Sequence, residues 1–507
     1  MLSFLFLVLM VVGIKLNNLG MGTKSVSKTL NYIIIKPRQK INLNLFEAEK
    51  YEPAIIVQQL VGNLIYYSNF GRYETRLADS WNKTDDFTWS FKLKKKLKCE
   101  NGEPINPDTF KKSLEKSILI FEKKGGIPIL SSLSGYNQFI SDNHNAKDIN
   151  ELKPILGIQA TDDSLIFKFD KKIKSGFLQI LSFSPFGYIC SENFTANGEW
   201  RDDLKFISSG PYKVSKISVG SEYRLTKNLN WLDFSQDAPD EIVVSHDDTL
   251  IKKEEPTIID AFTNEYTSSR LQPYKLVPEY INSVLIGNLA DGYFKLRSTR
   301  VRFKNLFDTE SAKILPLAFG VNTRSNTFYP NQQTQNIDDL EDGTSDLIVP
   351  TKPLLIEGTV PIEGTSRWHS WQVLKGTLDN LMFPYEFAGN ESSFEQMTNK
   401  NYDFRIRGSS IGGGVEAWGL YVSFCSSMGI NFPDPNGSIC KLIQEYENDA
   451  LSDEELSDQF LKTVNKEAAI LPVSHYGVQL FLSDHLDTSS FSPLLAIMKF
   501  DKIRILK

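Results

Sequence analysis

The sequence predicts an α/β protein built from more than one domain. Its 507 residues are 41% hydrophobic and 23% charged, which is enough apolar material for a large core. Length alone indicates two to four domains. Helical stripes and strand-like alternation follow one another along the chain, most clearly over residues 54–121.

Residues 54–64 and 87–93 show the two periodicities. In the first segment apolar residues recur every fourth position, which places them on one face of a predicted helix: Ile56, Leu60 and Leu64. In the second segment large apolar residues alternate with polar ones, which predicts a strand with one aromatic face: Phe87, Trp89, Phe91 and Leu93.

A turn and a second helix complete this stretch. Asn101 and Gly102 tolerate positive φ and predict the turn. Asn106 is a typical N-cap residue, and Pro107 suits the first position of a helix. The predicted helix carries an apolar stripe made of Phe110, Leu114, Ile118 and Phe121.

Four further segments continue the alternation of strands and helices. The β-branched run at 29–36 suits a buried strand, and residues 165–169 alternate as a strand does. Residues 371–381 and 456–468 carry apolar side chains at helical spacing. We find no internal repeat along the chain.

Several motifs occur in a fixed order. The first comprises Leu77-Ala78-Asp79-Ser80-Trp81, the aromatic strand and the Asn-Gly turn. Later motifs lie at 209–214 (Ser-Gly-Pro-Tyr-Lys-Val), 227–231, 298–308, 401–404 and 470–473. Taken together in this order, the motifs resemble those of the oligopeptide/dipeptide-binding family, family 5, of extracytoplasmic solute-binding proteins, which serve ABC transporters. Phe303 and Lys304 depart from the family's usual Gln-Ala.

The resemblance implies a periplasmic binding protein type II fold, with two α/β lobes around a cleft and hinge closure over a ligand. It also implies an extra subdomain in the first lobe and a return to that lobe at 470–473. The expected divisions are a signal-like segment at 1–24, lobe I at 25–52, 181–268 and 471–507, the extra subdomain at 53–180, and lobe II at 269–470.

The segment from Leu2 to Gly13 is almost wholly apolar. It is shorter than the roughly 20 residues that a spanning helix needs, so it fits the hydrophobic region of a secretory signal. No Lys or Arg precedes it and no clear small-x-small cleavage site follows. An uncleaved anchor and a misassigned start codon therefore stay open as alternatives. We expect an exported protein, periplasmic or otherwise extracytoplasmic.

Four cysteines are too few for a disulfide framework. Cys425 and Cys440 are close enough in sequence to pair in an oxidising compartment, and two buried thiols are the alternative. No C-x-x-C motif and no Cys/His cluster occurs in the sequence, so we expect no metal and no other cofactor.

The sequence gives no support for catalysis. It contains no H-E-x-x-H, and no G-x-S-x-G elbow. The Gly/Ser-rich segment 408–414 is not followed by Gly-Lys-Ser/Thr, so a flexible loop is favoured over a phosphate cradle. The five histidines are scattered. We therefore expect a binding protein and not an enzyme.

The resemblance places ligand contacts in two segments. Residues 41–51 would lie beside the ligand, with Glu49 and Tyr51 as candidates. Segment 416–427 would line the cleft, and Trp418 is its candidate aromatic wall. The family's Asp, which pairs with a peptide amine, is not in its usual place. The other candidates here are Glu416, Tyr421 and Phe424, and core packing is the alternative for the aromatic residues.

The expected function is capture of a peptide or related small molecule and its delivery to ABC transporter permease subunits, by a monomer. A net charge of −6 gives no indication of a nucleic-acid partner. Two alternatives stay open. One is a binding-protein fold that acts as an envelope sensor or interaction protein without a transporter, and the other is a secreted hydrolase.

Overall fold

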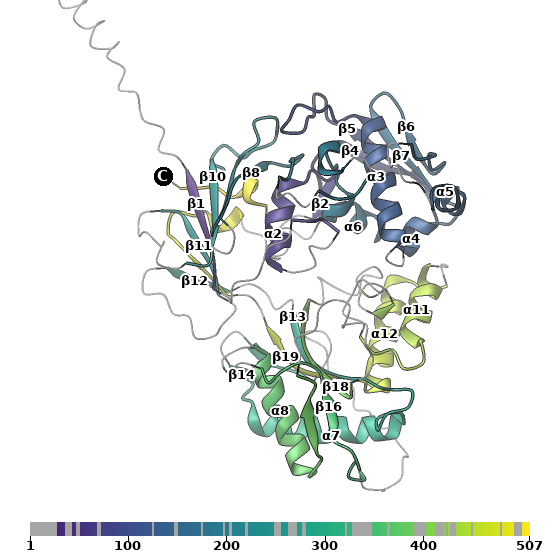
Figure 1. Ribbon diagram of the computed structural model, residues 1–507, viewed down its shortest axis with the longest axis vertical. Coiled ribbons are helices and arrows are strands. Elements are labelled where there is room, and N and C mark those ends of the chain that lie inside the picture. Colours follow the sequence, from purple (N-terminus) through teal and green to yellow (C-terminus); the bar gives the residue numbers. More distant parts are fainter. Residues whose placement is uncertain are drawn as a thin grey trace, which may run out of the picture.

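The computed structural model has two lobes, shown one above the other in Figure 1. None of the helices that the structure describes is long and apolar enough to cross a membrane. The described residues are 28–35, 43–46, 51–67, 72–123, 126–144, 146, 151–173, 176–195, 198–201, 205–218, 222–247, 255–261, 271–275, 280–319, 322–326, 347–361, 363, 366–389, 402–410, 420, 424–425, 432–447, 450–476, 479–490 and 499–506.

A seven-stranded sheet organises the upper lobe, in the order β12-β20-β11-β1-β10-β9-β8. At its centre lies β1 (Thr29–Ile35), a β-branched strand with apolar neighbours on both faces, as predicted. It pairs in parallel with β10 (Glu241–Ser245) and β11 (Thr257–Ala261). The strands that pair antiparallel are β8 (Tyr212–Ser218), β9 (Glu222–Lys227), β12 (Gln272–Lys275) and β20 (Gln479–Leu482).

A four-stranded sheet, β4-β5-β7-β6, builds a subdomain of the upper lobe. The aromatic strand β5 (Thr88–Leu93) and helix α3 (Pro107–Glu122) confirm the prediction, and the Asn106 side chain accepts a hydrogen bond from the Thr109 backbone N–H as its cap. The other elements are β2 (Ile65–Tyr67), β3 (Tyr73–Thr75), β4 (Ala78–Asp85), β6 (Ile158–Ala160), β7 (Ser164–Lys168), α4 (Pro128–Ser131), α5 (Tyr136–Asn143), α6 (Gly176–Ser182), η1 (Ser184–Phe186) and η2 (Ser191–Asn193).

Helix α2 (Tyr51–Leu60) ends four residues before the predicted end at Leu64. The Leu60 carbonyl accepts hydrogen bonds from the backbone N–H groups of Ser209 and Gly210. A Cβ on Gly210 would lie 2.6 Å from the Gln59 carbonyl oxygen, so this close approach requires glycine. The helical prediction for 61–64 is therefore wrong, because a distant segment takes the place of the next helical turn.

The lower lobe contains a second seven-stranded sheet, in the order β14-β15-β19-β13-β18-β16-β17. Its central strand β13 (Tyr280–Ile286) pairs antiparallel with β18 (Phe404–Ser410) and β19 (Ile470–Tyr476). Strand β16 (Leu354–Ile356) runs parallel to β18. The remaining strands are β14 (Ala318–Phe319), β15 (Asn322–Arg324) and β17 (Tyr385–Phe387).

Two pairs of helices cover opposite faces of this sheet. Helices α7 (Arg297–Ile314) and α8 (Ser366–Asn380) share a core with Val284 of β13. Helices α11 (Ser438–Glu447) and α12 (Asp453–Glu467) share another with Leu285. The two predicted helical stripes lie in α8 and α12 and are confirmed. Short helices η4 (Thr488–Ser490) and η6 (Phe500–Lys502) follow the last strand.

The strand order places the passages between the lobes. Strand β12 belongs to the upper sheet and β13 to the lower, so the first passage lies between Lys275 and Tyr280 and not at the predicted 269. Strand β19 still pairs with β13, so the chain returns between Tyr476 and Gln479. The return predicted at 470–473 is wrong, because those residues are paired inside the lower sheet.

Two disulfides join the four cysteines. Cys425 and Cys440 are bonded, with Cα atoms 5.6 Å apart. Cys99 and Cys190 form the second bond, across 91 residues of sequence. The sequence alone left the first pairing open. It gave no indication of the second, because that pair is brought together only by the fold.

Candidate ligand-binding site

The parallel strands of the upper lobe end where the chain passes to the lower lobe. Strand β11 ends at Ala261 beside Gln479, which opens β20 just after the second passage. Strands β1 and β10 run parallel to each other, as do β1 and β11, so their carboxyl ends lie at the same edge (Figure 1). In open α/β sheets, ligands bind outside the carboxyl ends of the strands.

The lower lobe follows the same rule. Tyr280 opens β13 just after the first passage and pairs with Ser410, the last residue of β18. Strand β16 runs in the direction of β18 and ends beside Phe404. The carboxyl ends of β16 and β18 therefore point toward the upper lobe. Parallel strands of both sheets thus run toward the junction of the lobes, and β16 ends level with Phe404 and Ile286, before the edge at Tyr280 and Ser410.

Three charged side chains meet at the end of β16. Arg405 and Arg407 lie on one face of β18 because they are two residues apart. Both bind Glu357, the first residue after β16. The Arg407 Nη2 donates to Glu357 Oε2 at 3.0 Å. Two guanidinium groups thus share the Glu357 carboxylate.

The two arginines differ in accessibility. The Arg405 side chain is 1% exposed, and its guanidinium lies 4.2 Å from the centre of the Tyr402 ring. The Arg407 side chain is 19% exposed and Glu357 is 13% exposed. Burial lowers the pKa of Arg407, and Glu357 opposes this shift. Arginine nevertheless stays charged, and a partly exposed guanidinium can bind a carboxylate with two parallel hydrogen bonds.

The upper lobe places two titratable groups at its own strand ends. Asp260, near the end of β11, is fully buried and accepts a hydrogen bond from the Tyr32 hydroxyl at 3.0 Å. His246 follows β10, and its Nδ1 lies 3.1 Å from the carbonyl oxygen of Ile34. Polar side chains therefore occur near the strand ends of both lobes.

The structure describes only some of the residues that the sequence predicts as ligand contacts. Glu49, Glu416, Trp418 and Tyr421 lie outside the described residues, and Tyr51 begins α2 with its side chain outside the description. Phe424 is 6% exposed and packs in the core of the lower lobe. Its ring lies among aromatic neighbours, with centres 5.1 Å from Phe432 and 5.5 Å from Phe460.

Sequence reasoning missed Arg405, Arg407 and Glu357. A signal was present, because Phe404 to Arg407 alternates apolar and cationic residues. Such alternation is ordinary on a strand with one solvated face. Here the cationic face is largely buried, which the local sequence does not show.

The comparisons with known proteins agree with this geometry. Residues 72–266 match the model of the bacterial extracellular solute-binding proteins, family 5 Middle. A putative binding protein of Haemophilus influenzae is 24% identical over 189 residues, and the periplasmic oligopeptide-binding protein OppA of that organism is 32% identical over 112 residues. These alignments cover 35% and 21% of this chain, and only 35% and 19% of those relatives.

The solved structure of Listeria monocytogenes OppA bound to peptide superimposes with a TM-score of 0.72 at 14% identity, covering 95% of this chain and 100% of that one. The fold is thus that of the type II periplasmic binding proteins, as the sequence predicted. Residues 72–266 are in addition similar to the family 5 solute-binding proteins.

Proposed function

We propose that the protein is an extracytoplasmic solute-binding protein that captures a peptide, or a related small molecule with a carboxylate, for an ABC transporter. The observation that carries the proposal is the partly exposed guanidinium of Arg407, which lies with Arg405 around Glu357, the first residue after β16. The relatives named for oligopeptide or peptide binding support the ligand class.

Capture would proceed by closure of the lobes about the two passages of the chain. A ligand held by Arg407 and by the strand ends of the upper lobe would bridge the lobes and favour the closed form. The aromatic wall at Trp418 and the contacts of Glu49 and Tyr51 stay predictions. Capture and release to permease subunits need no covalent step, and the relatives are binding proteins.

The disulfides support a location outside the cytoplasm. Disulfides persist in oxidising compartments and are rare in the reducing cytosol, and all four cysteines are paired. The apolar segment from Leu2 to Gly13 fits an export signal. We therefore expect protein from the envelope fraction to lack about the first 20 residues, which N-terminal sequencing would show. An intact Met1 on protein in the cytoplasm would contradict this location.

Native mass spectrometry of the purified protein tests the proposed function, together with calorimetric titration of Ala-Ala-Ala and its C-terminal amide. We expect a co-purified ligand that carries a carboxylate, and weaker binding of the amide by about tenfold or more. Equal affinity for acid and amide would contradict carboxylate recognition. Failure to bind any member of a short-peptide panel, with no co-purified ligand, would contradict the proposed function.

A further inference from the structure

Residues 499–506, here called the clasp, are inserted into the core of the upper lobe. Phe500 and Ile503 are fully buried. The Phe500 backbone N–H donates to the Gln59 side chain of α2 at 3.1 Å, and its ring packs 5.3 Å from that of Tyr32 in β1. The clasp therefore joins the central strand and the first helix of the lobe.

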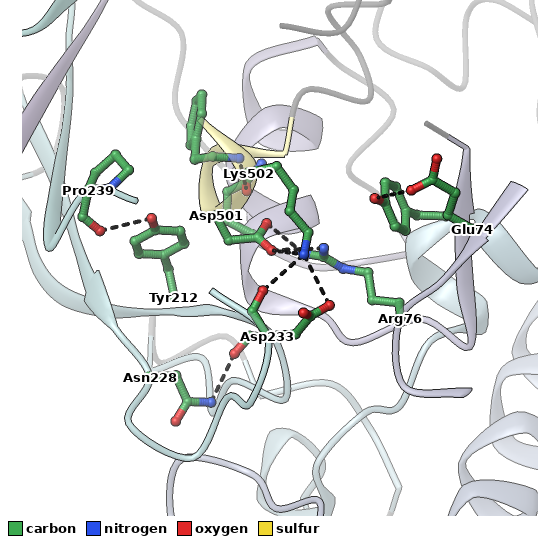
Figure 2. A network of polar contacts seen from close by, with 12 residues as sticks. Glu74, Arg76, Tyr212, Asn228, Asp233, Pro239, Asp501 and Lys502 are labelled. Carbon is green, nitrogen blue, oxygen red and sulfur yellow. Dashed lines mark hydrogen bonds and ion pairs between the residues drawn. The ribbon is translucent and has the colours of Figure 1, made fainter. Parts of the chain in front are cut away.

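A buried ion pair fixes the clasp to the subdomain, as Figure 2 shows. Arg76, at the start of the subdomain, is 1% exposed, and Asp501 is 0% exposed. The Nη1 and Nη2 atoms of Arg76 donate to the two carboxylate oxygens of Asp501 at 3.0 and 2.9 Å. The guanidinium lies 5.3 Å from the Tyr66 ring centre and 4.8 Å from that of Trp231. Aromatic rings thus enclose the pair.

A second pair lies beside the first. The Lys502 ammonium donates to Asp233 Oδ2 at 3.0 Å (Figure 2), and Lys94 approaches the same oxygen at 3.5 Å. Asp233 and Asp501 are therefore already matched by cations. This group of side chains holds at least as many positive as negative charges before any other residue is counted.

Lys499 adds a further amine at the start of the clasp. It is only 6% exposed, and burial disfavours a charged amine. Burial, followed by the charge of Arg76, lowers the pKa of Lys499 to about 7, while Asp501 opposes the shift. Of the neighbouring phenols, Tyr66 and Tyr212 have raised pKa values and stay neutral near pH 7, chiefly because they are buried. Other charged groups around the clasp are Glu74, Lys94, Asp233, Asp240 and Lys502, and within the clasp Arg504 forms an ion pair with Asp487.

We propose that the clasp is a proton-sensitive contact, in which protonation of Lys499 adds an unmatched positive charge to the buried Arg76–Asp501 site and loosens the clasp from the upper lobe. A free lysine binds its proton more tightly than the docked one. The docked form is therefore favoured most at alkaline pH. Docking of the clasp becomes weaker as pH falls to about 7. Below that pH Lys499 is protonated in both the docked and the free form, so docking weakens no further.

Hydrogen exchange in the full-length protein tests this proposal. Exchange of backbone amides in 499–506 and 231–238, corrected for intrinsic rates, is measured at about pH 6.5 and about pH 8.5. We expect protection to be at least about tenfold lower at the acidic pH. Equal protection at both pH values in the unmodified protein would overturn the proposal, and this outcome requires no variant.

Two substitutions assign the effect to one amine. Lys499→Met should keep the clasp protected at both pH values, because no proton can be added there. Lys227→Met is the matched control, since Lys227 binds Asp240 in the same lobe and is part-exposed; this variant should keep the pH response. A pH response that persists in Lys499→Met would overturn the assignment. If that variant does not fold, Lys499→Gln replaces it.

Discussion

Two groups of arginines and carboxylates, one in each lobe, differ in their exposure to solvent. In the upper lobe, Arg76 binds both carboxylate oxygens of Asp501, which Lys502 also approaches at 4.0 Å, and the Arg76 and Asp501 side chains are shielded from solvent. In the lower lobe, Arg405 and Arg407 share Glu357, and the Arg407 and Glu357 side chains remain partly exposed. One site is closed to solvent, whereas the other has an open side.

The difference separates a structural role from a binding role. A matched buried pair has no charge left for a ligand, and its loss is felt as folding stability. A partly exposed guanidinium can contact a ligand directly. Its partner Glu357 lies just after the carboxyl end of β16, the side of a strand on which ligands bind in open α/β sheets. The comparison therefore predicts that the two sites respond differently to the same substitution.

The largest effect is expected from Arg76→Met, which leaves Asp501 buried without its partner. Breaking a buried pair in this way costs about 3–5 kcal/mol, measured as the free energy of unfolding in urea. The double variant Arg76→Met/Asp501→Leu should recover most of the loss, because apolar groups can replace a buried pair. Arg407→Met, the matched variant in the lower lobe, should cost less than Arg76→Met, because Glu357 keeps Arg405 as a partner. Equal costs for Arg76→Met and Arg407→Met would remove the distinction between the sites.

The second effect concerns pH and again distinguishes the closed site. The pKa of Lys499 is about 7 in the folded protein and 10.5 ordinarily. The unfolded chain therefore binds more protons between these values, and stability rises with pH. Relative to Lys499→Met, the unmodified protein should gain about 2 kcal/mol between about pH 7 and pH 9, measured by urea unfolding at both pH values. Parallel pH profiles for the two proteins would contradict the pKa shift.

The smallest effect compares the disulfides of the two lobes. In the chain-entropy model, closing the 91-residue separation of Cys99 and Cys190 stabilises by about 4.6 kcal/mol, and the 15-residue separation of Cys425 and Cys440 by about 3 kcal/mol. The variant in which Cys99 and Cys190 are both serine should thus be less stable, by about 1.6 kcal/mol, than the variant in which Cys425 and Cys440 are both serine. Urea unfolding of both variants measures this difference. The opposite order would show that native contacts, and not loop length, decide the contribution of each bond.

Local sequence patterns were sufficient to predict several of the helices and strands, but they did not predict the two arginine sites. Strand β5, the capped helix α3 and the stripes of α8 and α12 follow from periodicity and capping, which act over a few residues. Helix α2 ends early because Ser209 and Gly210 bind its last carbonyl from a distant part of the sequence. The Arg76–Asp501 pair spans 425 residues, and no local pattern indicates it.

The type II fold was predicted from the order of the family motifs, and the comparison structures confirm it. The passages between lobes could not be placed as well. Strands 272–275 and 470–476 carry no local signal for the sheet to which they belong. Sheet membership depends on pairing partners far away in the chain, which a single sequence does not reveal.

The most direct test of the central claim is a calorimetric titration of Ala-Ala-Ala and its C-terminal amide against the unmodified protein and Arg407→Met. We predict that Arg407→Met weakens binding of the acid by about tenfold or more and leaves binding of the amide nearly unchanged, while the melting temperature stays within a few degrees. If Arg407→Met binds the acid as tightly as the unmodified protein does, or weakens acid and amide equally, then Arg407 does not bind the ligand's carboxylate and the assignment of the site is contradicted.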